Sequence, residues 1–318
     1  MGSKIKLGNS DLLVSPLTFG GNVFGWTLNE QASFKMLDCF TGSGFNFIDT
    51  ADTYSNWKAG NQGGESETII GNWLAKNGKR ADVIIATKVG GEMRANKKGL
   101  SAKYIKEAAE ASLKRLGTDY IDLYQSHYDD SETPISETMI AFNELIKEGK
   151  VRNIGASNLS AARIKESNDF ARKNNLVPYI SLQPLYNLYD RQKFEEQYLK
   201  LVSEESLAVL PYYSLGSGFL TGKYRTESDL SKSQRGRGIK KYLDERGLRI
   251  LATMDQVAEE QNVQLSQIAI AWLLHKLFVT SAIASSTKEK QLSELIQATT
   301  LKLTDSQVNK LDSASAYK

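Results

Sequence analysis

The sequence predicts an α/β protein built as a (β/α)8 barrel, and three observations lead to this fold class. Short apolar runs recur eight times along the 318 residues, and longer stretches with helical periodicity lie between them. Nearly continuous apolar strands that alternate with helices indicate a parallel sheet covered on its faces. Three residues at strand ends, Asp49, Lys88 and His127, follow each other at intervals of 39 residues, about one strand–helix unit. A doubly wound open sheet is the alternative, but no G-x-G-x-x-G follows the first strand to support it.

The predicted elements follow one another in a regular order. A short N-terminal hairpin around residues 12–16 precedes the first strand. Apolar residues at helical spacing predict helices over residues 101–116 and 136–148, which end at Gly117 and Gly149. A tail helix over residues 305–315 packs on the barrel after the eighth unit and closes its side or its bottom. The eight predicted strands are residues 17–20, 45–49, 83–88, 121–127, 152–157, 179–184, 208–213 and 279–284.

One segment departs from this alternation. Residues 214–223 are rich in glycine, and a polar, basic stretch that includes Arg235, Arg237, Lys240 and Lys241 continues to about residue 245. Its length and composition favour a functional loop or a mobile lid over a simple connector. A solvated, partly disordered excursion is the alternative interpretation.

Composition limits the class of protein. The hydrophobic fraction of 41% and the charged fraction of 24% are typical of globular proteins, and we expect one barrel domain over residues 1–318. Forty Lys and Arg against 37 Asp and Glu leave a net charge of +3, too small to indicate nucleic acid or an anionic membrane as the main partner. The single cysteine, Cys39, excludes an internal disulfide and a cysteine-based metal cluster. No run approaches the ~20 apolar residues of a membrane span, and Met1–Lys6 does not resemble a signal peptide, so a soluble cytoplasmic protein is expected.

The candidate catalytic residues come from neighbouring strand ends. Asp49 ends the apolar run 45–49 and Tyr54 follows it, while Lys88 and His127 end the next two strands. Side chains at the carboxyl ends of barrel strands converge on one mouth. We therefore expect Asp49, Tyr54, Lys88 and His127 to share one pocket.

These four residue types together form a proton donor. A free tyrosine has a pKa of about 10 and donates poorly near neutrality. A cationic Lys88 beside Tyr54 would lower that pKa, and Asp49 would keep the lysine charged and oriented. A neutral His127 would orient a substrate carbonyl toward the phenol, which suits an oxygen that becomes negative as its carbon accepts a hydride. The set contains no nucleophile, and one histidine with one aspartate is too few ligands for a metal site.

With these residues identified, the sequence resembles the aldo-keto reductases over essentially its whole length. The resemblance lies in residues 49–54, in 121–127, in Ile154–Gly155–Ala156–Ser157–Asn158, in Leu185–Tyr186–Asn187 after Gln183, and in residues 215–223. It implies an NAD(P)H-dependent carbonyl reductase in which Tyr54 is the acid, assisted by Lys88, Asp49 and His127. Within the family it is similar to bacterial members and to the branch that includes potassium-channel β subunits.

The resemblance also implies a cofactor site. It places the nicotinamide carboxamide against Ser157, Asn158 and Gln183, and a stacking ring at Tyr212. Amide and hydroxyl side chains suit a carboxamide, and a glycine-rich turn lets backbone amides approach a pyrophosphate. The complete predicted cofactor set is Gly21, Asn22, Asp49, Ser157, Asn158, Gln183, Tyr212, Ser214, Leu215, Gly216, Ser217, Lys223, Ser285, Thr287, Lys288, Gln291 and Glu294.

Two departures from the family pattern bear on cofactor choice and on the loop after the seventh strand. This chain has Tyr212–Tyr213–Ser214–Leu215 where relatives commonly have Trp-Ser-Pro-Leu or Tyr-Ser-Pro-Leu, which leaves the roles of Tyr213 and Ser214 open. It has residues 283–288 where relatives commonly have Ile-Pro-Gly, and the arginine that often grips a 2′-phosphate is missing. Lys288, with Ser286 and Thr287, could bind that phosphate at a helix N-terminus. NADP is therefore expected, with NAD possible.

The substrate and the assembly are not readable from the sequence. A small-molecule carbonyl compound is expected, with Trp26, Trp57 and Tyr128 as candidate substrate contacts above the mouth. These rings could equally pack beneath loops. Two other functions stay open: a cofactor-binding regulatory subunit with little turnover, and a barrel isomerase or lyase without redox chemistry.

Overall fold

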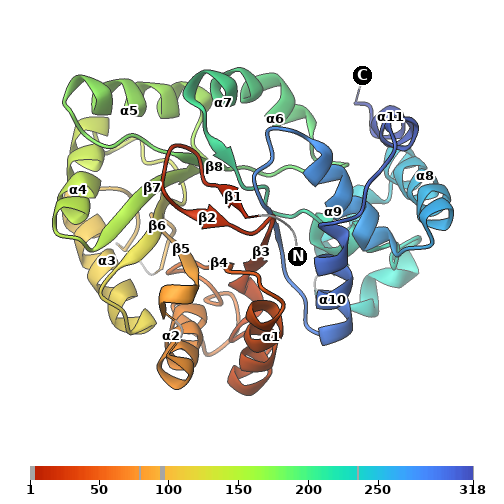
Figure 1. Ribbon diagram of the computed structural model, residues 1–318, viewed down its shortest axis with the longest axis horizontal. Coiled ribbons are helices and arrows are strands. Elements are labelled where there is room, and N and C mark those ends of the chain that lie inside the picture. The colour runs from red at the N-terminus through yellow and green to blue at the C-terminus, as the bar shows by residue number, and fades with distance from the viewer. Residues whose placement is uncertain (1–3, 79, 94–96, 235, 318) are drawn as a thin grey trace.

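Eight parallel strands form the centre of the fold in the order β10-β3-β4-β5-β6-β7-β8-β9. The computed structural model describes residues 4–78, 80–93, 97–234 and 236–317, so Arg235 and Met1–Ser3 lie outside the described residues. The backbone N–H groups of Thr280 and Ile283 donate to the carbonyl oxygens of Val209 and Pro211 at 2.9 and 3.0 Å, which joins β9 to β10. The sheet therefore closes on itself, and the predicted (β/α)8 barrel is confirmed (Figure 1).

The strands agree with the predicted runs, with small differences in length. Pro211 has no N–H to donate, and β9 contains only two residues. The last strand begins at Ala282, three residues later than predicted. The strands are β3 (Leu17–Gly20), β4 (Phe47–Asp49), β5 (Ile84–Val89), β6 (Ile121–Ser126), β7 (Val151–Ser157), β8 (Ser181–Gln183), β9 (Ala208–Val209) and β10 (Ala282–Ala284).

Helices surround the barrel and cover its outer face (Figure 1). Ser101 accepts a hydrogen bond from the Tyr104 backbone N–H to cap α3, and Gly117 ends that helix in the left-handed conformation, as predicted. The helices are α1 (Glu30–Gly42), α2 (Glu65–Asn77), α3 (Ala102–Leu116), α4 (Ile135–Lys147), α5 (Ala161–Lys173), α6 (Gln192–Gln197), α7 (Leu199–Glu205), α8 (Glu245–Gln261), α9 (Leu265–His275), α10 (Glu289–Ala298) and α11 (Asp305–Ala314).

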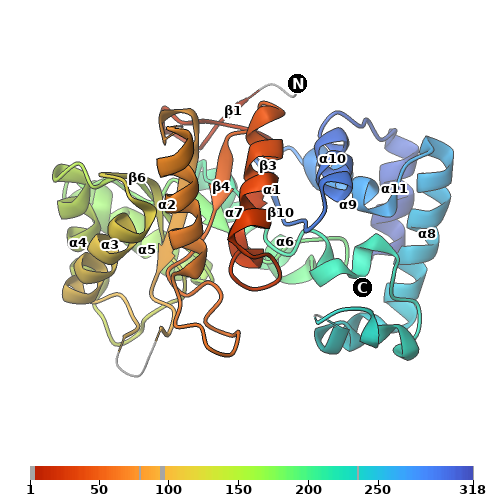
Figure 2. The same ribbon diagram turned by 90° about the horizontal axis from the view of Figure 1, so that it is seen from below.

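The two ends of the barrel differ. At the N-terminal end, the hairpin of β1 (Ile5–Lys6) and β2 (Leu13–Val14) contributes to the same buried cluster as the apolar residues inside the barrel. Figure 2 shows the hairpin at one end of the molecule and the long loops at the other. The hairpin therefore plugs the end opposite the mouth where the candidate site residues lie.

The tail helix α11 lies beside α8 on the side of the barrel (Figures 1 and 2). Lys310 pairs with Glu260 of α8 at 2.8 Å, and Asp312 accepts a hydrogen bond from the indole N–H of Trp272 in α9 at 2.9 Å. Of the two placements expected for this helix, the structure shows the side.

The segment over residues 216–245 folds into short 3-10 helices followed by the start of α8. These are η3 (Gly216–Thr221), η4 (Glu227–Lys232), η5 (Gly236–Gly238) and η6 (Lys240–Tyr242). Several of its cations pair with carboxylates: Arg225 with Asp255 at 2.7 Å, Lys232 with Asp229 at 2.7 Å and Lys240 with Glu227 at 3.1 Å. These three cations of the segment are therefore paired with nearby carboxylates.

Gly71 in α2 provides a test of the helix packing. A Cβ at Gly71 would overlap the carbonyl oxygen of Arg115 and lie 2.8 Å from the carbonyl carbon of Leu116, so backbone at the end of α3 would have to move. We expect Gly71→Ala to destabilise the protein by about 1–3 kcal/mol, measured as a shift in the urea midpoint. Gly42→Ala in α1 is the control, because a Cβ there meets nothing within 4 Å and alanine favours the helix. Equal stability of the two variants would contradict this close packing.

Candidate active site

Strand parity places the candidate residues inside the barrel. Successive side chains of a strand point to opposite faces. In β5, Ile84 and Ala86 belong to the cluster inside the barrel, so Lys88 shares their inward direction, while Thr87 points outward. The same alternation makes Asp49 of β4 follow Phe47 inward. Each strand therefore supplies a packed interior residue and then, at its carboxyl end, a polar one.

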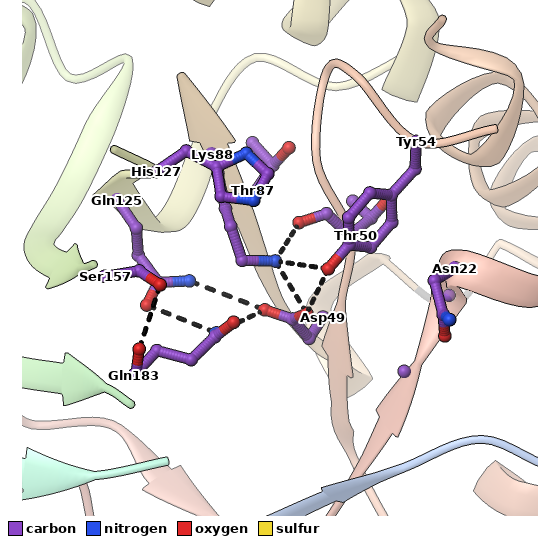
Figure 3. A network of polar contacts seen from close by, with 12 residues as sticks. Asn22, Asp49, Thr50, Tyr54, Thr87, Lys88, Gln125, His127, Ser157 and Gln183 are labelled. Carbon is purple, nitrogen blue, oxygen red and sulfur yellow. Dashed lines mark hydrogen bonds and ion pairs between the residues drawn. The ribbon is translucent and has the colours of Figure 1, made fainter. Parts of the chain in front are cut away.

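Lys88 is the centre of a buried polar network (Figure 3). Its ammonium group donates to Asp49 Oδ2 at 2.7 Å, to the Thr50 carbonyl oxygen at 2.7 Å and to Tyr54 Oη at 3.0 Å. Lys88 is 0% exposed and Asp49 is 1% exposed. Three acceptors thus match the three N–H donors of the ammonium group, which satisfies a charge that has no access to water.

Two glutamines hold the other oxygen of Asp49. The side-chain N–H groups of Gln183 and Gln125 donate to Asp49 Oδ1 at 2.8 and 3.4 Å. Gln183 was predicted as a cofactor contact, whereas Gln125 was missed. It lies two residues before His127, and side chains two residues apart on a strand point to the same face. The sequence could therefore have identified Gln125 as a residue of the site. With Oδ1 held in this way, Asp49 Oδ2 faces Lys88 and the more distant Tyr54 hydroxyl, which lies 3.4 Å away.

The pKa of Tyr54 moves in the direction opposite to the expected one. Burial raises the pKa of the Tyr54 phenol well above its usual value, and the negative charge of Asp49 raises it further. The expected lowering by Lys88 was therefore wrong for the free protein. Burial also lowers the pKa of Lys88, against which Asp49 acts. The result is a phenol that holds its proton firmly beside an ammonium group that is easier to deprotonate than usual.

His127 is held as a neutral imidazole. Burial lowers the pKa of His127 well below its usual value, and the charge of Lys88 adds to this effect. The ring is 8% exposed, lies 6.2 Å from the Tyr54 ring between centroids, and stacks on Tyr128 at 4.5 Å. Its buried Nδ1 has no hydrogen-bond partner among the described residues. The predicted neutral state of this histidine agrees with its surroundings.

The network opens onto a cavity of about 1240 Å³ at the mouth of the barrel. Tyr54, His127 and Asp49 line it, whereas Lys88 lies behind them. Trp26, Trp57 and Tyr128, the predicted substrate contacts, also line it. Most of the predicted cofactor set lines the same cavity: Asn22, Ser157, Asn158, Gln183, Tyr212, Ser214, Leu215, Ser217, Lys223, Ser285, Thr287, Gln291 and Glu294.

Three predicted cofactor residues do not line the cavity. Gly21 is buried against α2, where a Cβ would meet Ser66 Oγ at 2.9 Å. Gly216 is buried within η3. Lys288 is exposed and is the N-cap residue of α10. Lys288 is thus placed beside the cavity-lining residue Thr287, and its side chain would have to turn inward to reach a ligand.

The loop after β9 forms a tight turn beside the cavity. Gly216, Ser217 and Gly218 all have positive φ, at 54°, 56° and 99°. A Cβ at Gly218 would lie 3.4 Å from Lys223 Nζ, so the lysine amine stands directly over this turn. The backbone N–H groups of Gly216 and Gly218 already donate within the turn, to the carbonyl oxygens of Tyr213 and Leu215 at 2.7 and 2.9 Å, so the positive charge of Lys223 is what favours an anion here. The phosphate-binding role expected of this turn stays a prediction, supported by the cavity-lining Ser217 and Lys223.

Asp52 is buried behind the site in a place that the sequence did not indicate. Both of its carboxylate oxygens are buried without a hydrogen-bond partner among the described residues. Nearby Glu67, which is 0% exposed, pairs with Arg115 at 2.7 Å and accepts from Thr87 Oγ1 at 2.5 Å. Burial raises the pKa of Asp52 well above its usual value, and the charge of Glu67 raises it further. Burial and the charge of Glu67 therefore favour the protonated, neutral form of Asp52 in the folded state.

Sequence comparison shows the family to which the chain belongs. The model of the aldo/keto reductase family matches residues 16–316, so the chain belongs to this family, whose members are in general NAD(P)H-dependent carbonyl oxidoreductases. A probable voltage-gated potassium channel subunit beta of Arabidopsis thaliana is 37% identical over 301 residues, which cover 92% of this chain and 90% of the relative. Protein tas of Escherichia coli is 33% identical over 325 residues and 94% of each chain. Norsolorinic acid reductase of Aspergillus flavus is 32% identical over 329 residues, which cover 99% of this chain and 81% of the relative.

Within residues 4–78, 80–93, 97–234 and 236–317, the structure shows neither a cluster of metal ligands nor a membrane-spanning helix. There, no group of three or more His, Cys, Asp and Glu side chains is placed to hold a metal ion. None of the described helices is both long enough and apolar enough to cross a membrane.

The buried carboxyl of Asp52 leads to a prediction on stability. Its raised pKa means that the folded state keeps a proton that the unfolded state releases above a pH of about 4, so its contribution to stability falls as the pH rises. Asp52→Asn has no such proton. We therefore expect the variant to gain stability relative to the parent as the pH rises from 4 to 8, by at most about 1.4 kcal/mol per pH unit. Urea unfolding at several pH values measures this difference, with the exposed Asp82→Asn as the control. A difference that is constant with pH would show that Asp52 is ionised in the folded protein.

Proposed function

We propose that this protein reduces aldehyde or ketone carbonyls to alcohols with NAD(P)H, with Tyr54 as the proton donor. The observation that carries this proposal is the buried Asp49–Lys88–Tyr54 chain, which ends at a cavity beside a neutral His127. Tyr54 is the member of this chain that can offer a proton to a molecule in the cavity. Lys88 lies behind it, and Asp49 is an acceptor.

Proton donation depends on the opposite pKa shifts of two neighbours: the pKa of Tyr54 is raised and that of Lys88 is lowered. A phenol with a raised pKa keeps its proton until negative charge builds on a substrate oxygen. As the proton leaves, the Lys88 ammonium at 3.0 Å stabilises the phenolate, and its lowered pKa lets it return a proton to Tyr54. Asp49 keeps the ammonium group in place. This arrangement places stabilising charge where it develops during the reaction.

His127 is suited to orient the substrate. A neutral imidazole can donate one hydrogen bond to a carbonyl oxygen without placing a second positive charge beside Lys88. Its lowered pKa keeps it neutral at physiological pH. We therefore assign His127 to positioning the carbonyl between its ring and the Tyr54 hydroxyl.

The cavity fits a nicotinamide dinucleotide. Lys223, which lines the cavity beside Ser217 and Gly218, supplies positive charge for a pyrophosphate, and Ser157, Asn158 and Gln183 carry amide and hydroxyl groups suited to a carboxamide. Tyr212 Oη donates to Asn158 Oδ1 at 2.9 Å, which fixes the ring at the cavity wall. The buried Ser286 Oγ has no partner among the described residues, as expected of a group that awaits a ligand. When bound, the cofactor supplies the hydride, and these residues bind and orient it.

NADP is the cofactor we propose, with NAD as the alternative. Thr287, Gln291 and Glu294 line the cavity at the start of α10, and Lys288 is the N-cap residue of this helix. A helix N-terminus with a lysine favours an additional phosphate.

A second candidate function is a cofactor-binding subunit of a larger assembly. The observation that favours it is the 37% identity to a protein named as a probable potassium channel subunit beta. Tight NADPH binding with at most one turnover per site would support this function. Steady reduction of any member of a panel of aldehydes, ketones, quinones and sugars would favour the reductase.

Removing the Tyr54 hydroxyl tests the assigned acid. We expect Tyr54→Phe to lower kcat about 10²- to 10⁴-fold while the Kd for NADPH changes less than about twofold, because the phenol acts on the carbonyl. Steady-state rates and fluorescence titration measure the two quantities. Tyr104→Phe is a matched control, because its hydroxyl binds the Lys97 carbonyl oxygen away from the cavity. Turnover near the parent rate in Tyr54→Phe would remove Tyr54 from the acid role.

Lys288 tests the choice of cofactor. We expect Lys288→Ala to raise the Kd for NADPH about tenfold and that for NADH less than about twofold, because only NADPH carries the 2′-phosphate. Lys290→Ala, at another exposed position of the same helix terminus, controls for a general loss of positive charge. Equal losses for the two cofactors, or an equal effect of Lys290→Ala, would place the phosphate elsewhere.

A further inference from the structure

Tyr213 has an unusual backbone conformation for a large side chain. Its φ is +55°, in the left-handed region where glycine and asparagine are common and bulky residues are outliers. The other described non-glycine residues with positive φ are serines and asparagines: Ser55, Asn158, Asn175, Ser206, Ser217 and Asn262. A tyrosine at such a position indicates that its ring is needed where the backbone places it.

The surrounding structure holds this conformation. The Tyr213 carbonyl oxygen accepts hydrogen bonds from the Gly216 backbone N–H at 2.7 Å and from the buried Asn187 side chain at 2.9 Å. Asn187 also donates to Asp190 Oδ2 at 3.3 Å, and the same oxygen accepts from Tyr242 Oη at 2.6 Å. The backbone of Tyr213 is thus fixed by a network that reaches η6, while its ring is left 50% exposed at the cavity.

Further rings lie around the same mouth. Trp57 is 48% exposed and Tyr128 is 50% exposed, and both line the cavity. Together with Tyr213 they are the large aromatic side chains found exposed among the described residues. All three therefore lie at the mouth of the barrel. Tyr128 and Tyr213 lie near enough to Tyr54 that each contributes to raising its pKa.

The rings at the mouth meet one another edge to face, while Tyr128 stacks on His127 with one of its faces. Trp57 meets Trp26 and Tyr54 edge to face, with centroids 5.8 Å apart in both pairs. Tyr212 and Tyr213 meet in the same way at 5.2 Å. Aromatic rings prefer offset-stacked or edge-to-face partners, and a flat ring that enters this mouth can find both kinds.

We propose that Tyr213 is a specificity-determining residue that, with Tyr128 and Trp57, selects flat aryl aldehydes and ketones as substrates. The inference rests on the proposed carbonyl reduction and names the substrate class for that site. Tyr213 provides a ring wall, and the carbonyl attached to the bound ring is directed toward Tyr54 and His127.

The test compares two aldehydes of similar size that differ in aromaticity. Benzaldehyde and cyclohexanecarbaldehyde are reduced by the parent protein and by two variants, and the ratio of their kcat/KM values is measured. Tyr213→Asn removes the ring but tolerates the left-handed backbone, and Tyr213→Phe keeps the ring and removes the hydroxyl. We expect Tyr213→Asn to lower the benzaldehyde to cyclohexanecarbaldehyde ratio about five- to tenfold, and Tyr213→Phe to leave it within about twofold of the parent. Circular dichroism and the Kd for NADPH show that each variant is folded and binds cofactor.

The possible results separate three claims: the role of the Tyr213 ring, the aryl substrate class, and carbonyl reduction itself. An unchanged ratio in Tyr213→Asn, or an equal fall in Tyr213→Phe, would overturn the role of the Tyr213 ring while carbonyl reduction itself stands. Faster reduction of cyclohexanecarbaldehyde than of benzaldehyde by all three proteins would overturn the aryl class. Failure of the parent protein to reduce any carbonyl compound would overturn the proposed function and this inference with it.

Discussion

The buried ion pair between Lys88 and Asp49 is the interaction on which the site depends. Both residues are buried, and removing one partner of such a pair typically costs about 3–5 kcal/mol because the other charge is left uncompensated. Burial lowers the pKa of Lys88, and the carboxylate of Asp49 opposes that change. The same carboxylate raises the pKa of Tyr54. One ion pair therefore sets both a lysine that gives up its proton more easily and a tyrosine that gives it up less easily.

The barrel makes this pair possible by geometry. Adjacent parallel strands place Asp49 opposite Ala86 in register, and Lys88 lies two residues further along β5 on the same inward face. Lys88 can therefore extend back toward Asp49 from the level of the mouth. Gln125 of β6 and Gln183 of β8 lie on the same inward face. Their side chains donate to Asp49 Oδ1, the carboxylate oxygen that does not contact Lys88. Residues far apart in the sequence meet because their strands end at the same rim.

Features that follow from strand periodicity could be predicted from the sequence, and features that depend on loop packing could not. Asp49, Lys88 and His127 end apolar runs, so their convergence required only the closed parallel sheet. Asp52 stands three residues after Asp49, and nothing in the local sequence shows that its side chain is buried where the charge of Glu67 of α2 acts on it. The sign of the Tyr54 pKa change was equally hidden. It depends on the burial of the hydroxyl and on the balance between Asp49 and Lys88, and both arise only in the folded protein.

Backbone conformation shows how the rigid barrel and the loops share the function. Asn175, Ser206 and Asn262 have positive φ at the ends of helices, where the left-handed conformation is ordinary. Ser55, Asn158, Tyr213 and Ser217 have positive φ at the mouth of the barrel. Conformations of this kind cost free energy and persist where neighbouring hydrogen bonds hold them, as those of Asn187 and Gly216 hold Tyr213. The barrel strands fix the polar groups of the proposed proton donor, and the constrained loops fix the surfaces that a ligand would meet. A change in a loop at the mouth can therefore alter which molecule is bound while the Asp49–Lys88 pair stays in place.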